Sequence, residues 1–454
     1  MYRTKEGEAV MKYDEALTYI HGLYWKGKKS GLEKTKELLE LCGHPERGLN
    51  CIHIAGTNGK GSTAAMLESV CRCAGLKTGL YTSPYIVRYN ERIQVSGQEI
   101  PDEQLSLLTE YLAGMVEQME IPPSEFEFGT VLAFLYFKEQ QCDIVILETG
   151  LGGTFDSTNV IENPLLCIIT ALGLDHTAQL GSTMTQIANA KAGIIKQGIP
   201  VVFYGENKEG EAVIRKRCEE LSSSLVMPDF AGLKSEGLGG LTDCQQFSYK
   251  REPGTDALEA AAEGHNIEYS HLRLSLPGLY QQKNAALVLE AVEQLKKKGL
   301  PLTVDAVQKG LCSVHWQARL EVLLNKPLVL ADGSHNPLGM QATVESLRQY
   351  FPDKRLQFVF GAMADKELNA MIKLFLPLAG KVYVTAPAMP RAMDAEALLS
   401  LCQRNCTGKT VPEFVLCRKV QDAVSLIRKE GEQEVVVVIG SLYLAGEVKR
   451  LMKG

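Results

Sequence analysis

The sequence predicts an α/β fold with two domains, each built on a mostly parallel sheet. Short aliphatic runs such as residues 143–147 and 435–439 are typical of strands that are buried on both faces. Segments with helical spacing separate these runs, and this alternation indicates doubly wound sheets. A glycine-rich turn after the first run predicts a phosphate loop. We therefore expect a P-loop-containing, doubly wound, mostly parallel N-terminal domain over residues 1–312 and a Rossmann-like α/β domain over residues 313–454.

The elements of the N-terminal domain follow in chain order. Residues 1–10 are polar and lack the apolar core of a signal peptide, so we expect a disordered leader and then a helical segment over residues 11–42. Residues 228–270 are rich in glycine, serine and charge, which predicts irregular surface hairpins. The pattern further predicts strands at 51–55, 77–82, 143–147, 165–170 and 200–203, a polar loop at 85–96, and helices at 105–119, 128–140, 185–195, 282–298 and 304–311.

A second series of buried strands defines the C-terminal domain. The predicted strands are 328–330, 356–360, 381–385, 413–416 and 435–439, and helical patterns separate them. We expect the boundary between the domains near residues 312–318.

Composition limits the classes of partner. The chain has 454 residues, of which 45% are hydrophobic and 22% charged, as in ordinary globular proteins. A net charge of −6 without a long basic run argues against nucleic acid or an anionic membrane. No apolar stretch is long enough to cross a bilayer, and the 12 scattered cysteines are typical of a reducing compartment. We expect a cytoplasmic monomer.

The segment after residues 51–55 is the most informative part of the chain. Backbone N–H groups of a glycine loop can approach phosphate oxygens, and a helix N-terminus favours negative charge. Lys60 is placed to neutralise phosphate, and the Ser62 hydroxyl is placed to ligate Mg²⁺. The strict P-loop pattern is not met, because Ile54 stands where its first glycine belongs; the alternative is an ordinary glycine turn. The expected ATP-binding residues are Gly56, Thr57, Asn58, Gly59, Lys60, Gly61 and Ser62.

Polar residues follow other predicted strands, and ligands of open parallel sheets bind at the carboxyl ends of strands. Glu148 leaves strand 143–147 beside a glycine turn, as a Mg²⁺ ligand or as a turn-stabilising acid. His176 follows strand 165–170, as a metal or phosphate contact or as a partly buried hydrogen-bonding residue. Ser83 follows strand 77–82 as a metal or substrate contact.

Basic residues stand near these ends. Arg88 and Arg92 lie in the polar loop 85–96, which suits an anionic substrate or is simply solvated. Lys191 lies near the end of helix 185–195, where one alternative is a favourable C-terminal helix charge. In the C-terminal domain, glycine-containing polar turns follow four strands and form one edge suited to a ligand.

Taken together, these motifs resemble those of the folylpolyglutamate synthase and dihydrofolate synthase family, within the Mur ligase superfamily. The resemblance extends from about Met11 to Glu447, which is nearly the whole chain. Its motifs are HIAGTNGKGS at 53–62, TSP at 82–84, NERI at 90–93, FE at 126–127, ETGLGG at 148–153, DSTN at 156–159, DH at 175–176, KAGI at 191–194, QQKN at 281–284, DGSHNP at 332–337, GAM at 361–363, DK at 365–366 and GSLYLAG at 440–446.

The resemblance implies an ATP-dependent ligase. ATP would phosphorylate a folate carboxylate, and the amine of L-glutamate would displace phosphate from the acyl phosphate; tetrahydrofolate is the expected acceptor, with dihydropteroate as a second one. By this resemblance, Ser62, Ser83 and Glu148 would bind one Mg²⁺, and Glu148, His176 and a carbamylated Lys191 would bind a second. The expected ATP contacts across the domain cleft are Asn284, Arg319, Asp332 and His335, and the expected substrate contacts are Ser83, Arg88, Arg92, Phe126 and Asp156. The expected catalytic residues are Lys60, His176 and Lys191.

The chain departs from the family pattern at several positions. Tyr85 replaces a common histidine, Thr154 an arginine, Ala190 a glutamate and Tyr280 a histidine, and Gln317 with Ala318 replaces Pro-Gly. These changes bear on pterin and glutamate-tail preference. Two alternatives stay open: a Mur-type ligase for another carboxylate, and a nucleotide-binding relative that has lost catalysis. Retention of the phosphate and metal residues favours an active enzyme.

Overall fold

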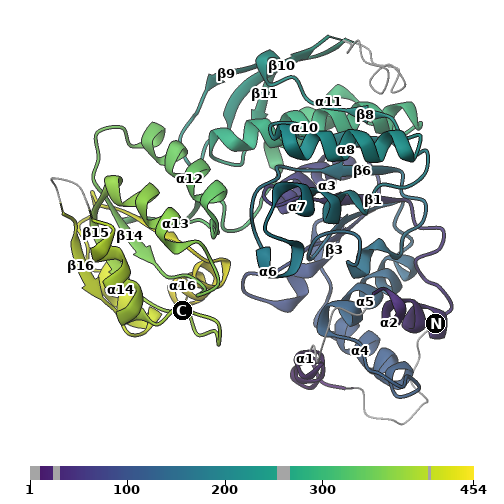
Figure 1. The fold of residues 1–454 in the computed structure, drawn as a ribbon, viewed down its shortest axis with the longest axis horizontal. Helices are drawn as coiled ribbons and strands as arrows, with labels where there is room; N and C mark the ends of the chain where they lie inside the picture. Colours follow the sequence, from purple (N-terminus) through teal and green to yellow (C-terminus); the bar gives the residue numbers. More distant parts are fainter. Residues whose placement is uncertain (1–10, 24–30, 253–265, 407–410, 454) are drawn as a thin grey trace. The chain divides into compact units, whose positions relative to one another are not determined.

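The computed structural model describes residues 11–23, 31–252, 266–406 and 411–453 (Figure 1). The chain forms two compact units. The first consists of Met1–Leu233, Tyr249–Tyr269 and Asn284–Ser313. The second consists of Lys234–Ser248, Ser270–Lys283 and Val314–Gly454.

The first unit contains a mostly parallel sheet. Among the described residues it has eight strands in the order β4-β3-β2-β5-β1-β6-β7-β8. The bounds are β1 Cys51–Ala55, β2 Thr78–Tyr81, β3 Ile93–Val95, β4 Gln98–Glu99, β5 Ile144–Glu148, β6 Leu166–Ile169, β7 Val201–Phe203 and β8 Leu225–Val226. Strands β2, β5, β1, β6, β7 and β8 run parallel, whereas β3 and β4 add an antiparallel edge. The predicted doubly wound class is confirmed, and β1 and β5 are buried along their whole length, as their aliphatic sequences predict.

Helices cover this sheet. Four helices pack together as one group below the strands in Figure 1. They are α1 (Tyr13–Gly22), α2 (Glu33–Leu41), α4 (Asp102–Val116) and α5 (Glu125–Glu139). α3 (Lys60–Cys73) packs against α11 (Val304–Ser313), and α7 (Met184–Ala192) packs against α8 (Lys208–Glu220). α6 (Thr177–Leu180) and α10 (Leu279–Lys297) are the remaining helices that matter for the site.

Two predictions for the N-terminal part need correction, and a third is not tested. The helical segment 11–42 is two helices, α1 and α2, and residues 24–30 between them lie outside the described part. The predicted loop 85–96 contains a 3-10 turn, η1 (Tyr89–Arg92), and strand β3, because its short apolar alternation is completed by pairing with β2. The expected leader at 1–10 lies outside the described residues.

The segment 228–270 was expected to be irregular, and this was wrong for its described part. It contains β9 (Leu233–Gly237), β10 (Gln245–Arg251) and the start of β11 (Ile267–Leu274), which form a sheet in the order β11-β10-β9. Buried and exposed residues alternate along β10, the period of a strand with one buried face. The polar residues Gln245 and Arg251 stand at buried positions, so the sequence does not show this period.

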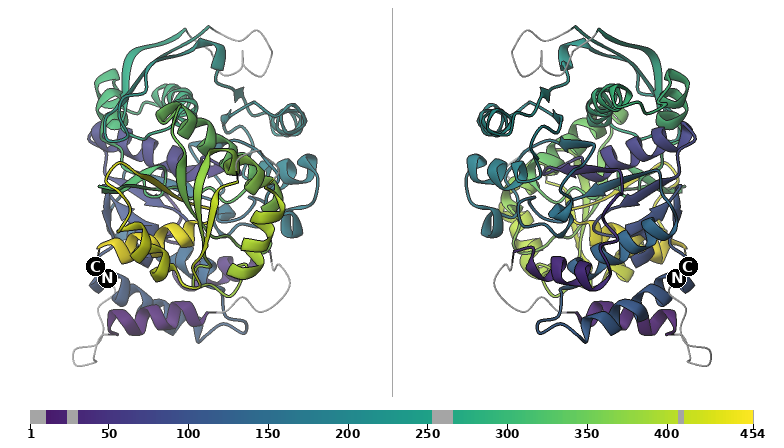
Figure 2. Two further views of the ribbon diagram at one scale, coloured as in Figure 1. Left: turned by 90° about the vertical axis from the view of Figure 1, so that its left-hand side faces the viewer. Right: turned by 90° about the vertical axis from the view of Figure 1, so that its right-hand side faces the viewer.

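The second unit holds a smaller α/β sheet. Its described strands have the order β12-β13-β17-β14-β15-β16, with bounds Glu321–Asn325, Leu328–Ala331, Val435–Ile439, Leu356–Phe360, Ala379–Val384 and Glu413–Leu416 in that order. All pairs are parallel except β12 with β13, and β12 is an edge strand that the sequence did not predict. Helices lie on both sides of these strands (Figure 2). They are α12 (Pro337–Tyr350), α13 (Leu368–Phe375), α14 (Ala395–Arg404), α15 (Val420–Ile427) and α16 (Leu442–Lys453).

Within the described ranges, no helix combines the length and the apolar character that a membrane span needs.

Candidate active site

The phosphate loop joins β1 to α3 in the first unit. Gly56 has φ +151°, and a Cβ built on it would lie 1.8 Å from the Thr170 hydroxyl oxygen, so a side chain has no room. Gly59 precedes the helix with φ +87°, a left-handed conformation that glycine adopts without strain. The backbone N–H groups of Thr57 and Asn58 donate to the carbonyl of Ala171, which fixes the loop to the end of β6. The sequence therefore folds here into a tight loop at a helix N-terminus, the arrangement that binds phosphate.

Lys60 is folded back onto this loop. Its Nζ donates to the carbonyl oxygens of Gly56 at 3.2 Å and Thr57 at 3.4 Å. The same atom lies 3.9 Å from Oε1 of Glu148, and the lysine side chain is 18% exposed. A partly shielded ammonium group beside the loop can neutralise a bound phosphate more strongly than a group in bulk water.

Glu148 is the last residue of β5, next to β1 in the sheet. Its Oε2 accepts a hydrogen bond from the backbone N–H of Ser83 at 3.2 Å, because β2 ends beside β5. Ser62 lies in the first turn of α3 and is buried. The structure thus brings Ser83 and Glu148 together, and Lys60 with them.

Lys191 reaches the same loop from α7. It is almost fully buried, and its Nζ donates to the carbonyl oxygen of Gly56 at 2.6 Å. Burial, and then the charge of Lys60, lower the pKa of Lys191 to about 7, against the opposing effect of Asp175 and Asp156.

His176 follows β6, on the same edge of the sheet as Glu148. It is half-buried and has φ +49°, a left-handed conformation directly before α6. The backbone N–H of His176 donates to Oδ1 of the neighbouring Asp175 at 2.8 Å. The order β2-β5-β1-β6 therefore places Ser83, Glu148, the phosphate loop and His176 at successive carboxyl ends of the sheet.

The donor set suits Mg²⁺, a hard cation that prefers oxygen ligands. Glu148 supplies a buried carboxylate, and Ser62 and Ser83 supply hydroxyls. Among the residues that the structure describes, no three His, Cys, Asp or Glu side chains cluster as a metal site. The predicted Mg²⁺ ligands include only two side chains of those four types, Glu148 and His176. The other predicted ligands are the serine hydroxyls and Lys191.

The predicted substrate residues divide into two groups. Arg92 lies with its guanidinium carbon 5.2 Å from the Tyr85 ring centroid and 5.4 Å from that of Tyr89, and it pairs with Glu125 at 3.4 Å. Arg88 instead pairs with Asp102 at 2.5 Å, on an exposed surface. Arg92 therefore lies between aromatic rings and Glu125 of α5, whereas Arg88 lies over the Tyr13 ring and pairs with Asp102.

Phe126 and Asp156 stand beside the turn that follows β5. A Cβ on Gly150 would lie 2.6 Å from the Phe126 ring, so this glycine allows the ring to contact the turn. Asp156 is buried and accepts hydrogen bonds from the backbone N–H groups of Leu151 and Thr158 and from the Thr158 hydroxyl. Burial raises the pKa of Asp156, and these hydrogen bonds oppose the shift.

Asn284 also belongs to the first unit. A Cβ on Gly59 would lie 2.8 Å from Oδ1 of Asn284, so this predicted ATP contact lies directly against the phosphate loop.

The other predicted ATP contacts belong to the second unit. Asp332 follows β13 and accepts hydrogen bonds from the backbone N–H groups of Leu320 and Ser334 and from the Thr343 hydroxyl, all within 3.0 Å. A Cβ on Gly333 would lie 2.7 Å from Nη1 of Arg319. His335 is half-buried, and its Nδ1 lies 2.8 Å from the Gly333 carbonyl, so Nδ1 carries the proton. Asp332 therefore holds the turn that carries Arg319.

Comparison with known proteins decides the family. The family model of the Mur ligase middle domain matches residues 54–292, and that of the Mur ligase glutamate ligase domain matches residues 318–442. A Bacillus subtilis protein named dihydrofolate synthase/folylpolyglutamate synthase is 38% identical over 450 residues, which cover 97% of this chain and 99% of that protein.

The chain belongs to the folylpolyglutamate synthase and dihydrofolate synthase family.

Solved structures of this family have the same fold. The apo form of Lacticaseibacillus casei folylpolyglutamate synthase matches with a TM-score of 0.82 and 33% identity, and the match covers 98% of this chain and 100% of that one. A Mycobacterium tuberculosis folylpolyglutamate synthase in complex with ADP and AMPPCP matches with a TM-score of 0.84 and 28% identity, over 98% and 99% of the two chains. The predicted family, fold and enzyme class, an ATP-dependent carboxylate–amine ligase, are confirmed.

Two departures from the family pattern now have a structural context. Thr154 donates its hydroxyl to the carbonyl of Ala190 at 3.1 Å, so the two replaced residues contact each other. Ala318 has φ +52°, a conformation that suits glycine, and its N–H donates to Glu321. Glu321 also binds Lys449 of α16, which reaches Gln317 as well.

His53 and Thr158 form a buried network with Asp156 that the sequence did not reveal. The one available signal was a histidine inside an otherwise aliphatic strand.

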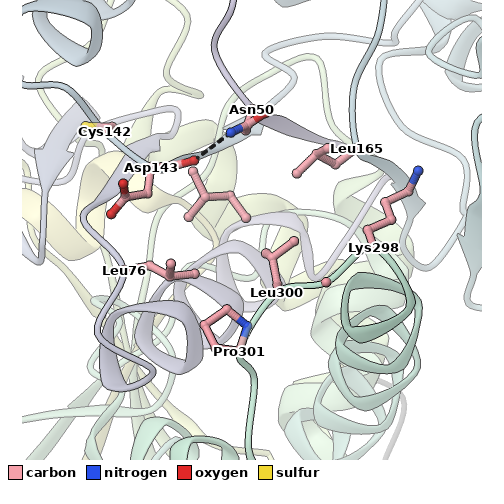
Figure 3. Close-up of a pocket in the computed structure, with 10 residues that line it drawn as sticks. Asn50, Leu76, Cys142, Asp143, Leu165, Lys298, Leu300 and Pro301 are labelled. Atoms are coloured by element: carbon pink, nitrogen blue, oxygen red, sulfur yellow. Dashed lines mark hydrogen bonds between the residues drawn. The ribbon is translucent and has the colours of Figure 1, made fainter.

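A separate pocket of about 390 Å³ is lined by Asn50, Leu76, Cys142, Asp143, Ile144, Leu165, Lys298, Gly299, Leu300 and Pro301 (Figure 3). Several of these residues directly precede strands, so the pocket lies at the amino ends of the sheet, away from the phosphate loop, and it includes no predicted site residue.

Proposed function

We propose that the protein joins L-glutamate to a carboxylate of tetrahydrofolate with ATP, through an acyl phosphate. The observation that carries this proposal is the approach of Lys60 to Glu148, 3.9 Å apart across a glycine loop at a helix N-terminus. A carboxylate is a poor acylating agent until one of its oxygens becomes part of a good leaving group. The folylpolyglutamate synthase–AMPPCP–folate complex, which matches with a TM-score of 0.83 and 32% identity, supports this pair of substrates.

The residues of the first unit divide this work. The phosphate loop would hold the nucleotide, and Lys60 would neutralise the charge that moves with the transferred phosphoryl group. Glu148 with Ser62 and Ser83 would hold Mg²⁺, which supplies Lewis-acid stabilisation of that charge when bound. Phe126, Arg92 and Asp156 would contact the folate. Arg88 is also a proposed substrate contact, because its positive charge suits an anionic substrate. Its ion pair with Asp102 already compensates that charge.

A second Mg²⁺ is proposed at Glu148, His176 and a carbamylated Lys191. Carbamylation joins the neutral amine of Lys191 to CO₂ and releases one proton, which turns a cation into an anionic oxygen ligand. A pKa of about 7 leaves much of this amine neutral near neutral pH. The change of sign is needed, because an ammonium group would repel the metal ion.

We also propose roles for the C-terminal part, with the functional domains divided at residues 312/313. Arg319, Asp332 and His335 would serve ATP use from residues 313–454, while Asn284 would do so beside the phosphate loop. The cluster around Asp332 supports this, because Asp332 accepts hydrogen bonds from Leu320 and Ser334 and so holds together the two segments that carry Arg319 and His335.

A second activity, the addition of glutamate to dihydropteroate, is favoured by the Bacillus subtilis relative, whose name includes dihydrofolate synthase. The discriminating experiment offers ATP and labelled L-glutamate with tetrahydrofolate, dihydropteroate or a cell-wall precursor. Incorporation with tetrahydrofolate is the expected result. Incorporation only with the cell-wall precursor would favour another Mur-type ligase, and no incorporation with tight ATP binding would favour a relative that has lost catalysis.

A further inference from the structure

A buried chain of hydrogen bonds joins the middle of β1 to the proposed substrate site. Nε2 of His53 lies 2.7 Å from the Thr158 hydroxyl oxygen, and this oxygen lies 2.6 Å from Oδ1 of Asp156. His53 and Thr158 are fully buried, and Asp156 is 4% exposed. All three belong to the first unit.

The direction of this chain follows from counting protons. An ionised Asp156 only accepts, so the single hydroxyl proton of Thr158 goes to Asp156. Nε2 of His53 must then carry a proton and donate it to the Thr158 oxygen. A neutral imidazole has one protonated nitrogen, so Nδ1 is bare, and this atom is buried without a hydrogen-bond partner among the described residues. Burial keeps the imidazole neutral by lowering the pKa of His53 to about 3.

The chain fixes how Asp156 is presented. Oδ1 accepts from the hydroxyl and the backbone N–H of Thr158, whereas Oδ2 accepts from the backbone N–H of Leu151. These bonds hold the carboxylate in one rotamer and favour its charged form, against burial, which raises the pKa of Asp156. A carboxylate held in one rotamer accepts further N–H donors only from a fixed direction, so it distinguishes ligands by where their donors lie.

We infer that His53 and Thr158 are positioning residues that hold Asp156 as an acceptor for N–H groups on the ring system of the acceptor substrate. The inference rests on the proposed function, because it takes Asp156 to contact that substrate. Neither residue needs to touch the substrate itself. Their loss should therefore weaken acceptor binding and leave the phosphate loop unaffected.

The test uses the full chain and compares Thr158→Val, which removes only the hydroxyl, with Thr158→Ser, which keeps it. Thr158→Val should raise the KM for tetrahydrofolate about tenfold, the effect expected from one hydrogen bond to a charged group. The KM for MgATP should stay within about twofold, and Thr158→Ser should restore most of the affinity. Thr109→Val is a matched control, because the Thr109 hydroxyl is equally buried but donates only to a carbonyl inside α4.

A second measurement reads the direction of the chain without any activity. In histidine-selective ¹⁵N NMR, the signals that disappear in His53→Gln belong to His53. They should show a protonated Nε2 and a bare Nδ1; a protonated Nδ1 would overturn the inference. An unchanged tetrahydrofolate KM in Thr158→Val would also overturn it, as would an equal rise of both KM values.

Asp156→Asn separates this inference from the proposed function. If Asp156→Asn raises the KM for tetrahydrofolate and Thr158→Val does not, only the positioning role fails. If Asp156→Asn also leaves that KM unchanged, Asp156 does not contact the substrate, and the proposed substrate site fails with the inference.

Discussion

Lys60 and Lys191 direct their ammonium groups at the same carbonyl oxygen, that of Gly56, at 3.2 and 2.6 Å. Two cations that converge on one loop repel each other, and this repulsion is part of why the pKa of Lys191 is lowered to about 7. The pair is well suited to a site that receives an anion, because bound phosphate would relieve the repulsion.

Lys60→Ala should abolish ligation and leave the fold intact. The substitution removes charge beside the phosphate loop and no core packing, and loss of one such electrostatic donor lowers kcat by about 10²–10³. Initial rates and thermal melting, measured together, check this. Lys309→Ala is a control from the exposed side of α11. Near-parental turnover of the Lys60 variant would remove the phosphate-loop assignment.

Glu148→Gln should impair Mg²⁺-dependent activity, since the amide keeps the shape but not the charge of the carboxylate that lies beside Ser83. A metal ligand should matter at least as much as a group that orients one, whose loss costs about 10–100-fold. Titration of activity with Mg²⁺ at saturating ATP is the measurement, with the exposed Glu139→Gln as control. An unchanged Mg²⁺ response would identify Glu148 as a turn acid.

Lys191 should make activity depend on CO₂. Its pKa of about 7 leaves the amine neutral above that pH and protonated below it, so the carbamate should form readily above pH 7 and be lost as the pH falls. Enzyme depleted of CO₂ should lose activity and regain it with bicarbonate. With ¹³CO₂, a carbamate signal should appear in the parent and be absent in Lys191→Arg. Full activity without CO₂ and without that signal would contradict the assignment.

His53 predicts a pH dependence of stability. Its pKa is about 3 in the fold and 6.5 for the unperturbed group, so its contribution is fully present above pH 6.5 and is lost as the pH falls toward 3. Between pH 7 and pH 5, the free energy of unfolding should therefore fall by about 2 kcal/mol less in His53→Gln than in the parent. Urea unfolding at both pH values measures this difference. Equal falls in the two proteins would mean that His53 does not resist protonation.

The central strands could be predicted because their surroundings leave little choice. β1, β5 and β17 are buried along their whole length, and apart from His53 and Glu148 their residues are apolar, which the sequence shows. Strand β12 escaped prediction, since an edge strand is only half-buried and its residues Glu321–Asn325 depend on the partner β13. The alternating burial of β10 was hidden because Gln245 and Arg251, two polar residues, occupy buried positions.

The site could be predicted where a short glycine-containing motif also carries the charged side chain. Gly56 and Lys60 share one such motif, and Glu148 begins another. The sequence could not show side-chain pairing between elements. Arg88 and Arg92 look alike in the sequence, but their partners differ. Arg92 lies over the Tyr85 and Tyr89 rings, whereas Arg88, which precedes η1, pairs with Asp102 and lies over the Tyr13 ring. Likewise, nothing local pairs His53 with Thr158, which lies 105 residues further along the chain.

The most direct test of the account follows the oxygen atoms of the substrate. Tetrahydrofolate labelled with ¹⁸O in its carboxylates is incubated with the enzyme, MgATP and L-glutamate, and the released phosphate is analysed by mass spectrometry. An acyl phosphate requires that the amine displace phosphate at the carbonyl carbon, so one labelled carboxylate oxygen should appear in each phosphate released. Amide formation with unlabelled phosphate would contradict activation of a folate carboxylate at this site.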